Sequence, residues 1–136
     1  MRKDFNSGYG KNLKMNDEVY ALRRQVIDII YQAKKVLRSN GIELPRLDVR
    51  IIENAIDKPQ VLGVAQLNEN IIWIATSVLS KYKAHLRDVV YHEIVHAVTG
   101  FGHDDNCKLM APCINLLPLN DDDANRLLVK YFKPSI

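Results

Sequence analysis

The sequence predicts a small α+β domain in which a long N-terminal helix packs on a small mixed sheet. Apolar residues recur at helical spacing over residues 16–40, and short runs rich in β-forming residues follow between 47 and 75. Two more helical segments are expected at residues 83–99 and from residue 120 onward. The chain has 136 residues, of which 47% are hydrophobic and 26% charged, so it can bury a core without disulfide staples.

The first helix is expected to begin at Asn16, whose side chain can cap a helix N-terminus, and to stop at Asn40-Gly41. Asp17 and Glu18 in the first turn suit the positive end of the helix dipole. The apolar residues of this segment follow a spacing of 3.6 residues: Val19, Leu22, Val26, Ile29, Ile30, Ala33, Val36 and Leu37. A long helix with one apolar face must pack against another layer, which is the sheet.

Three runs predict the strands of that sheet. Leu47–Ile51 alternates apolar and polar residues, and Ile52 extends it. Val61–Gln66 and Ile71–Ala75 are the other two strands, the last being especially rich in β-formers. Trp73 lies in the third run, where its ring is expected to pack within the sheet core.

The chain is expected to form one domain at residues 16–136, preceded by a flexible tail at 1–15 that lacks apolar periodicity. No apolar run approaches the roughly 20 residues of a membrane-spanning helix, and the basic N-terminus has no apolar stretch behind it. We therefore expect a cytoplasmic protein that does not contact membranes. The net charge of +3 is too small to indicate a nucleic-acid partner, and no pattern predicts the oligomeric state.

The helix predicted over residues 83–99 carries the segment HEIVH at residues 92–96. At 3.6 residues per turn, His92 and His96 leave the same side of the helix, and Glu93 lies about 100° around from His92. Apolar residues occupy the opposite side of the same helix: Leu86, Val90, Ile94, Ala97 and Val98. This division indicates a catalytic Zn²⁺ site, in which two imidazoles bind one ion and Glu93 is the general base.

A third ligand must come from outside this helix, and we expect it to be His103. Gly100 and Gly102 tolerate positive φ, so the chain can leave the helix there and double back toward the ion. Asp104 and Asp105 are alternative third ligands that the sequence leaves open.

Three more side chains near the motif have simpler interpretations. His85 lies on the same face but about 10.5 Å along the helix axis from His92, too far to share its ion, so we expect a surface histidine. Cys107 and Cys113 are expected to be free thiols in a reducing compartment, with a short disulfide as the alternative in an exported protein.

Residues 92–103, with the sequence HEIVHAVTGFGH, resemble the zinc motif of the metzincin metallopeptidases, which is HExxHxxGxxH followed by a Met-turn. The sequence LMAP at residues 109–112 resembles that Met-turn. The resemblance implies a zincin-like fold with one catalytic Zn²⁺ held by His92, His96 and His103. It also implies that Met110 forms a hydrophobic floor beneath the metal without binding it.

The broader resemblance covers residues 47–132. The segment from residue 119 to 131 is similar to the final helix of the matrixin branch, which docks behind the site. The resemblance also implies that residues 62–67 form the edge strand that pairs with an extended protein or peptide substrate, with Gly63, Val64 and Ala65 at its centre. The motif departs from the family at one point, because Gly100 and His103 each come one residue late and Thr99 takes the glycine position.

Three functions follow from these patterns. The first is a zinc metalloendopeptidase that hydrolyses peptide bonds. The second is a non-catalytic, zinc-stabilised binding or scaffold domain, a hypothesis motivated by the small size of the chain and its displaced third histidine. The third is a protease that acts on DNA-bound protein, because the chain also resembles zincins of the SprT type; basic residues in the N-terminal third are its support.

Overall fold

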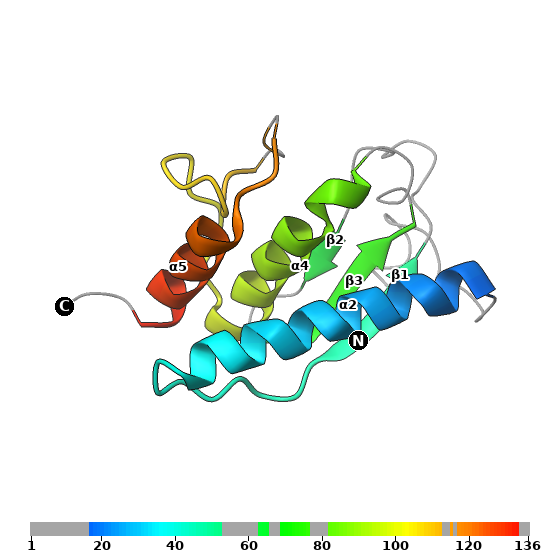
Figure 1. Ribbon diagram of the computed structural model, residues 1–136, viewed down its shortest axis with the longest axis horizontal. Coiled ribbons are helices and arrows are strands. Elements are labelled where there is room, and N and C mark those ends of the chain that lie inside the picture. Colours follow the sequence, from blue (N-terminus) through cyan, green and yellow to red (C-terminus); the bar gives the residue numbers. More distant parts are fainter. Residues whose placement is uncertain are drawn as a thin grey trace.

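The computed structural model describes residues 17–52, 63–65, 69–76, 82–112, 115 and 117–133 (Figure 1). The predicted tail at 1–15 lies outside them, and so does Cys113. The helices are α2 (Asp17–Arg38), α4 (Leu86–Ile94) and α5 (Asp121–Phe132), and the strands are β1 (Asp48–Ile52), β2 (Gly63–Ala65) and β3 (Ile71–Ala75). A 3₁₀ turn (Lys83–His85) precedes α4 and a π-helical turn (Val95–Thr99) follows it. The predicted α+β class is confirmed.

The three strands form one mixed sheet in the order β1-β3-β2. β1 runs parallel to β3, with Val49 opposite Ile72, whereas β2 runs antiparallel to it, with Val64 opposite Trp73. Trp73 is buried, as predicted, in a small cluster with Ile52 on one face of the sheet. Among the described strands, this order places β2 at one end of the sheet.

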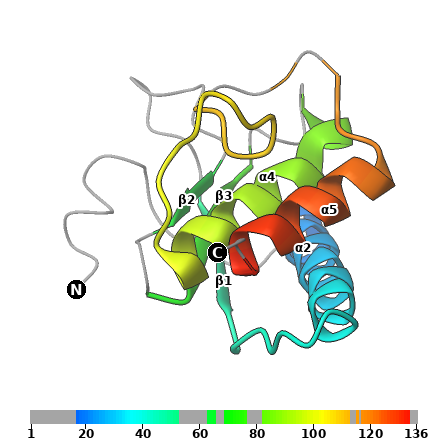
Figure 2. The ribbon, with the colours of Figure 1, turned by 90° about the vertical axis from the view of Figure 1, so that its left-hand side faces the viewer.

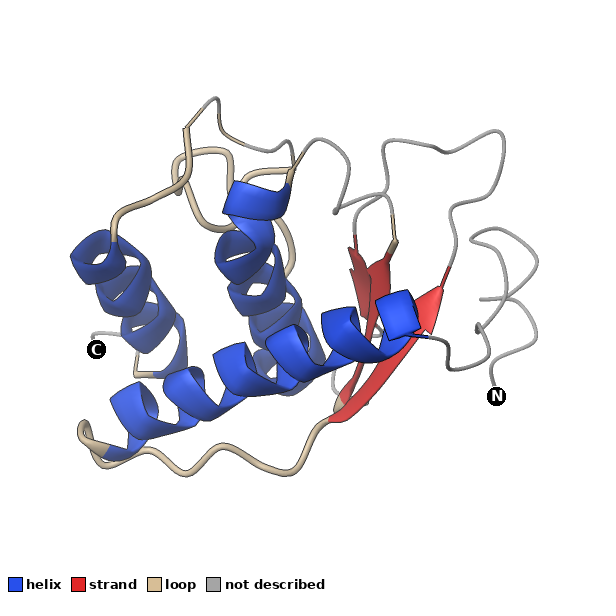
Figure 3. Ribbon diagram, turned by 45° about the vertical axis from the view of Figure 1, so that its right-hand side comes forward, coloured by secondary structure: helices blue, strands red, loops and turns tan. Residues whose placement is uncertain are grey.

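The long helix α2 crosses the whole domain and packs against β1, α4 and α5. Figure 3 shows it reaching from the sheet to the C-terminal helix. Its buried side chains, which include Leu22, Val26 and Leu37, share one core with Val90 and Ile94 of α4. The apolar stripe read from the sequence is therefore the face that α2 presents to this core.

The structure divides the single helix predicted at 83–99 into three parts. Because Lys83–His85 forms a 3₁₀ turn, the α-helical wheel does not apply to His85, and the prediction of a surface histidine is wrong. His85 is buried, with its ring 5.9 Å from that of Tyr82. At the other end, Val95–Thr99 winds as a π-helical turn, and Gly100 ends it with φ of 79°.

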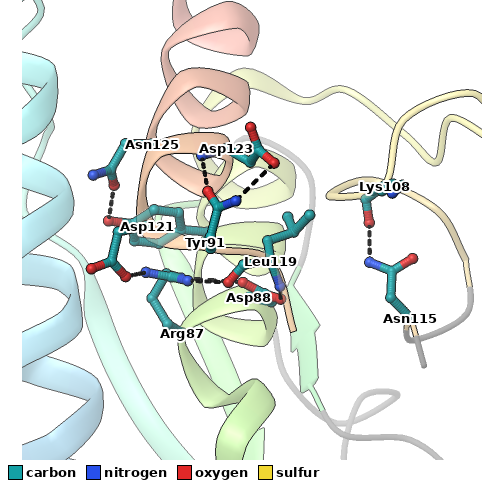
Figure 4. A network of polar contacts seen from close by, with 10 residues as sticks. Arg87, Asp88, Tyr91, Lys108, Asn115, Leu119, Asp121, Asp123 and Asn125 are labelled. Carbon is teal, nitrogen blue, oxygen red and sulfur yellow. Dashed lines mark hydrogen bonds and ion pairs between the residues drawn. The ribbon is translucent and has the colours of Figure 1, made fainter. Parts of the chain in front are cut away.

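Polar contacts lock the start of α5 to α4 (Figure 4). The buried carboxylate of Asp88 accepts hydrogen bonds from the Leu119 N–H at 2.8 Å and from Arg87 Nε at 3.1 Å. The same Arg87 donates to the Leu119 carbonyl at 2.7 Å and to Asp121 at 2.8 Å. As predicted, Asn120 caps α5, its side chain accepting the Asp123 N–H at 2.7 Å.

Tyr91 adds a further link between the two helices. It is buried, and its hydroxyl donates to Asn125 of α5 at 2.8 Å. Tyr91 therefore faces α5 and holds this helix beside α4.

No helix in the described parts of the chain is long and apolar enough to cross a membrane.

Candidate metal centre

Three histidine side chains converge at the end of α4. His92 and His96 project one turn apart with their Nε2 atoms 3.0 Å from each other. The His103 ring lies beside both, with centroid distances of 5.2 Å to His92 and 4.9 Å to His96. One nitrogen from each ring lies within 4.8 Å of the other two. The 3.0 Å between the Nε2 atoms of His92 and His96 is close to the roughly 3.3 Å that separates two ligands on a tetrahedral zinc ion. This three-histidine cluster can hold a metal ion.

Backbone carbonyls orient two of the imidazoles. His92 Nδ1 lies 2.7 Å from the Leu109 carbonyl, and His96 Nδ1 lies 2.7 Å from the Phe101 carbonyl. Because a carbonyl oxygen only accepts hydrogen bonds, each Nδ1 carries the proton and each Nε2 keeps its lone pair. Metal-binding histidines are typically held in this way, with the outer ring nitrogen donating to the protein.

The electrostatics of the cluster keep these imidazoles neutral. Burial, together with the positive forms of His96 and His103, lowers the pKa of His92 to about 4 against the opposing effect of its hydrogen bond to the Leu109 carbonyl. Burial likewise lowers the pKa of His96. Neutral imidazole is the form that binds metal, so the two rings are ready to bind an ion at neutral pH without first losing a proton.

The π-helical turn accounts for the late position of the third histidine. A π turn contains more residues per turn than an α turn, because its hydrogen bonds join residues five apart instead of four. The turn at Val95–Thr99 therefore takes up one additional residue before Gly100 leaves the helix in the left-handed region. His103 consequently reaches His92 and His96 although it lies seven residues after His96.

The loop that carries His103 is anchored by the next residue. The Asp104 N–H donates to the Met110 carbonyl at 2.9 Å, and the Asp104 carboxylate accepts from the Asn106 N–H at 3.0 Å and from the Tyr131 hydroxyl at 2.8 Å. The Tyr131 hydroxyl and the Asn106 N–H hold the pKa of Asp104 below its usual value. Figure 2 shows this segment, in yellow, folding back beside α4 before α5 begins.

Among the described residues, the metal-competent cluster contains neither Asp104 nor Asp105. Both oxygens of Asp104 are engaged in holding the loop. His103 is thus the group that the fold brings to His92 and His96, which favours it over the two aspartates as third ligand.

The Met-turn-like segment packs under this loop. Met110 is fully buried, and the preceding Leu109 supplies the carbonyl that orients His92. Cys107 is a buried free thiol in the same core. The role of Met110 as a floor for the metal stays a prediction.

Glu93 projects from α4 toward the edge strand. It is buried, with 5% of its surface exposed, and burial raises its pKa to about 8. Gly63 of β2 lies directly against it, since a Cβ atom added to Gly63 would come within 2.9 Å of Glu93 Cγ and Oε2. Gly63 was predicted for its place on the edge strand, and the structure adds that its lack of a side chain makes room for Glu93.

Sequence reasoning missed several groups that shape this centre. The carbonyls of Leu109 and Phe101 carry no side-chain signal, so no residue pattern predicts them. The anchoring turn at Asp104 had a signal, because an aspartate two residues before Asn106 is typical of a side-chain-to-backbone turn. Its partner Tyr131 comes from α5, twenty-seven residues away, and only the fold joins them.

Comparison with protein families finds none that matches this chain, and comparison with curated proteins finds no significant match. Fold and site together define the class of protein: a small α+β domain with a three-histidine cluster that can hold a metal ion.

Proposed function

We propose that this protein is a zinc-dependent metalloendopeptidase, with His92, His96 and His103 as metal ligands and Glu93 as general base. The observation that supports it most is the three-histidine cluster, whose first two members flank Glu93 in α4 and the π-helical turn that continues it. Three imidazole ligands are typical of a catalytic zinc site, which keeps a fourth position for water, whereas structural zinc sites use four protein ligands, often cysteines. The resemblance to the metzincin motif and Met-turn agrees with this donor set.

The chemistry follows from the side chains. A zinc ion held by His92, His96 and His103 would lower the pKa of a water molecule to about 7 and polarise the scissile carbonyl. With such an ion in place, Glu93 would accept a proton from that water and deliver it to the leaving amine. Burial raises the pKa of the Glu93 carboxyl to about 8 in the metal-free protein, and a nearby zinc ion would lower that pKa and so favour the ionised form that accepts the proton.

The substrate would bind as an extended segment along β2. β3 pairs with one side of this strand, and no other described strand pairs with its other side. Gly63, Val64 and Ala65 are each half-buried. An extended peptide that adds to such an edge forms main-chain hydrogen bonds irrespective of its sequence, which suits an endopeptidase.

The decisive experiment combines metal analysis with cleavage. Wild-type protein and Glu93→Gln are purified, their zinc content is measured, and both are incubated with a mixed peptide library. We expect one zinc per chain in both proteins, and cleavage slower in the variant by about 10²- to 10⁴-fold because its amide cannot accept the proton. Absence of zinc, or equal cleavage by the two proteins, would refute the proposal.

The same experiment separates the alternative functions. Stoichiometric zinc with no cleavage of any peptide, together with a melting temperature that collapses in chelator, would favour the scaffold domain. The displaced histidine that motivated this alternative is accommodated by the π-helical turn. A salt-sensitive mobility shift with DNA would be required for a protease that acts on DNA-bound protein.

Gly63→Ala is expected to reduce peptide cleavage about tenfold to a hundredfold while leaving zinc content unchanged. The added Cβ would overlap Glu93 Cγ and Oε2 at 2.9 Å, and displacing a general base by about an ångström has effects of this size. The matched control is Gly102→Ala, because a Cβ at Gly102 meets nothing within 4 Å. Full activity of Gly63→Ala, or equal losses in both variants, would contradict the role assigned to Gly63.

A further inference from the structure

The hydroxyl of Thr99 lies at the centre of a chain of hydrogen bonds that ends on a metal-competent histidine. Thr99 Oγ1 donates to the Val95 carbonyl at 2.6 Å and accepts the Phe101 N–H at 3.2 Å. The carbonyl of the same Phe101 accepts the Nδ1 proton of His96 at 2.7 Å. One side chain thus connects the last helical turn to the backbone group that orients the His96 ring.

We propose that Thr99 is a positioning residue for His96, a role that rests on the metal site of the proposed function. Its hydroxyl fixes the peptide between Gly100 and Phe101 after the chain has left the π-helical turn. The Phe101 carbonyl is thereby held where it keeps the His96 proton on Nδ1 and directs Nε2 toward His92 and His103.

The local backbone explains why this position needs such a group. Gly100 adopts φ of 79°, and its N–H bonds to the His96 carbonyl at 3.2 Å, so the chain turns sharply at this point. Phe101 is 44% exposed, and its ring contact is an edge-to-face one with Tyr131 at 5.5 Å. The hydrogen bond from its N–H to Thr99 therefore adds a restraint on the backbone of a residue whose side chain is partly exposed.

Threonine suits this position through both of its hydrogen-bonding roles. A threonine hydroxyl that donates to the carbonyl four residues earlier bends the end of a helix. The same oxygen then accepts the N–H two residues later, as serine and threonine do in turns. Valine has the same shape but can do neither, whereas serine can do both.

The test measures metal binding by wild type, Thr99→Val and Thr99→Ser. Zn²⁺ affinity is measured by competition with a chromogenic chelator, and the visible spectrum of the Co²⁺-loaded protein reports the ligand geometry. We expect Thr99→Val to bind Zn²⁺ about 10- to 100-fold more weakly, as with other groups that orient a metal ligand, and to alter the Co²⁺ spectrum. Thr99→Ser should restore both properties to within a few-fold of wild type.

Equal affinity and an identical Co²⁺ spectrum in wild type and Thr99→Val would overturn the inference while leaving the metal site intact. Failure of wild type to bind either metal would instead overturn the proposed function together with this inference. Circular dichroism of the metal-free proteins verifies folding. If Thr99→Val does not fold, Thr99→Ala takes its place under the same criteria, because it also lacks the hydroxyl.

Discussion

His103→Ala is expected to lower the affinity for zinc at least a hundredfold. A complete four-ligand site contributes about 10–16 kcal/mol, so one ligand corresponds to roughly 3 kcal/mol, which is about two orders of magnitude. His103 is the third member of the metal-competent cluster, and its ring lies about 5 Å from the two others. Asp105 is outside that cluster, and Asp105→Ala should leave the affinity within a few-fold of wild type.

The Asp104→Ala variant tests the effect of a residue that holds the loop of His103 in place but does not itself bind zinc. The Asp104 carboxylate accepts hydrogen bonds from Tyr131 and Asn106, so its removal loosens the loop that carries His103. We expect an intermediate loss of about tenfold in zinc affinity, measured by the same chelator competition. His85→Ala is the histidine control, since His85 does not belong to the cluster. A larger loss in Asp105→Ala than in His103→Ala would mean that the third ligand had been misassigned.

The elements with the strongest periodic patterns could be predicted closely from the sequence. The first helix was expected from Asn16 to Asn40-Gly41 and spans Asp17–Arg38, because a long apolar stripe with a terminal glycine leaves few alternatives. The third strand was expected at Ile71–Ala75 and occupies those residues. The second strand spans Gly63–Ala65, within the predicted Val61–Gln66, whose remaining residues lie outside those described.

The helix around the motif could be predicted only in part. Periodicity placed His92 and His96 on one side, and the structure agrees. The 3₁₀ turn before α4 and the π-helical turn after it have no periodic signature over three to five residues. The hydrogen-bond pattern of each turn depends on how the chain enters or leaves α4, and for the π-helical turn this means reaching the loop of His103. Such a path is a property of the tertiary structure.

The environment of Glu93 could not be predicted from the sequence at all. Its burial depends on the approach of Gly63, thirty positions earlier in the chain, through the packing of β2 on α4. The motif identified Glu93 as a carboxylate beside the metal-binding histidines, but not that the fold surrounds it with protein. This burial has a consequence for stability that can be measured separately from activity.

In the metal-free protein, Glu93→Gln is expected to be more stable than wild type, by a margin that grows with pH. Burial raises the pKa of Glu93 from 4.5 to about 8, so the folded state keeps a proton that the unfolded chain loses. Wild type therefore loses stability as the pH rises from about 4.5 to about 8, and the loss is complete above that range. At 1.36 kcal/mol per pH unit, the difference reaches about 3 kcal/mol at pH 7. Glutamine has no proton to lose and avoids this cost.

Urea denaturation in the presence of chelator, at several pH values between 5 and 8, measures the difference in unfolding free energy between Glu93→Gln and wild type. The lowered pKa of His92 makes both proteins less stable as the pH falls from 6.5 toward 4, but this effect cancels in the comparison. Glu43→Gln, at an exposed carboxylate, is the control whose difference from wild type should change little with pH. If the difference in unfolding free energy between Glu93→Gln and wild type did not change with pH, Glu93 would be ionised in the folded protein. Adding zinc should reduce the excess stability of Glu93→Gln over wild type, because a neighbouring cation favours the charged carboxylate of wild type.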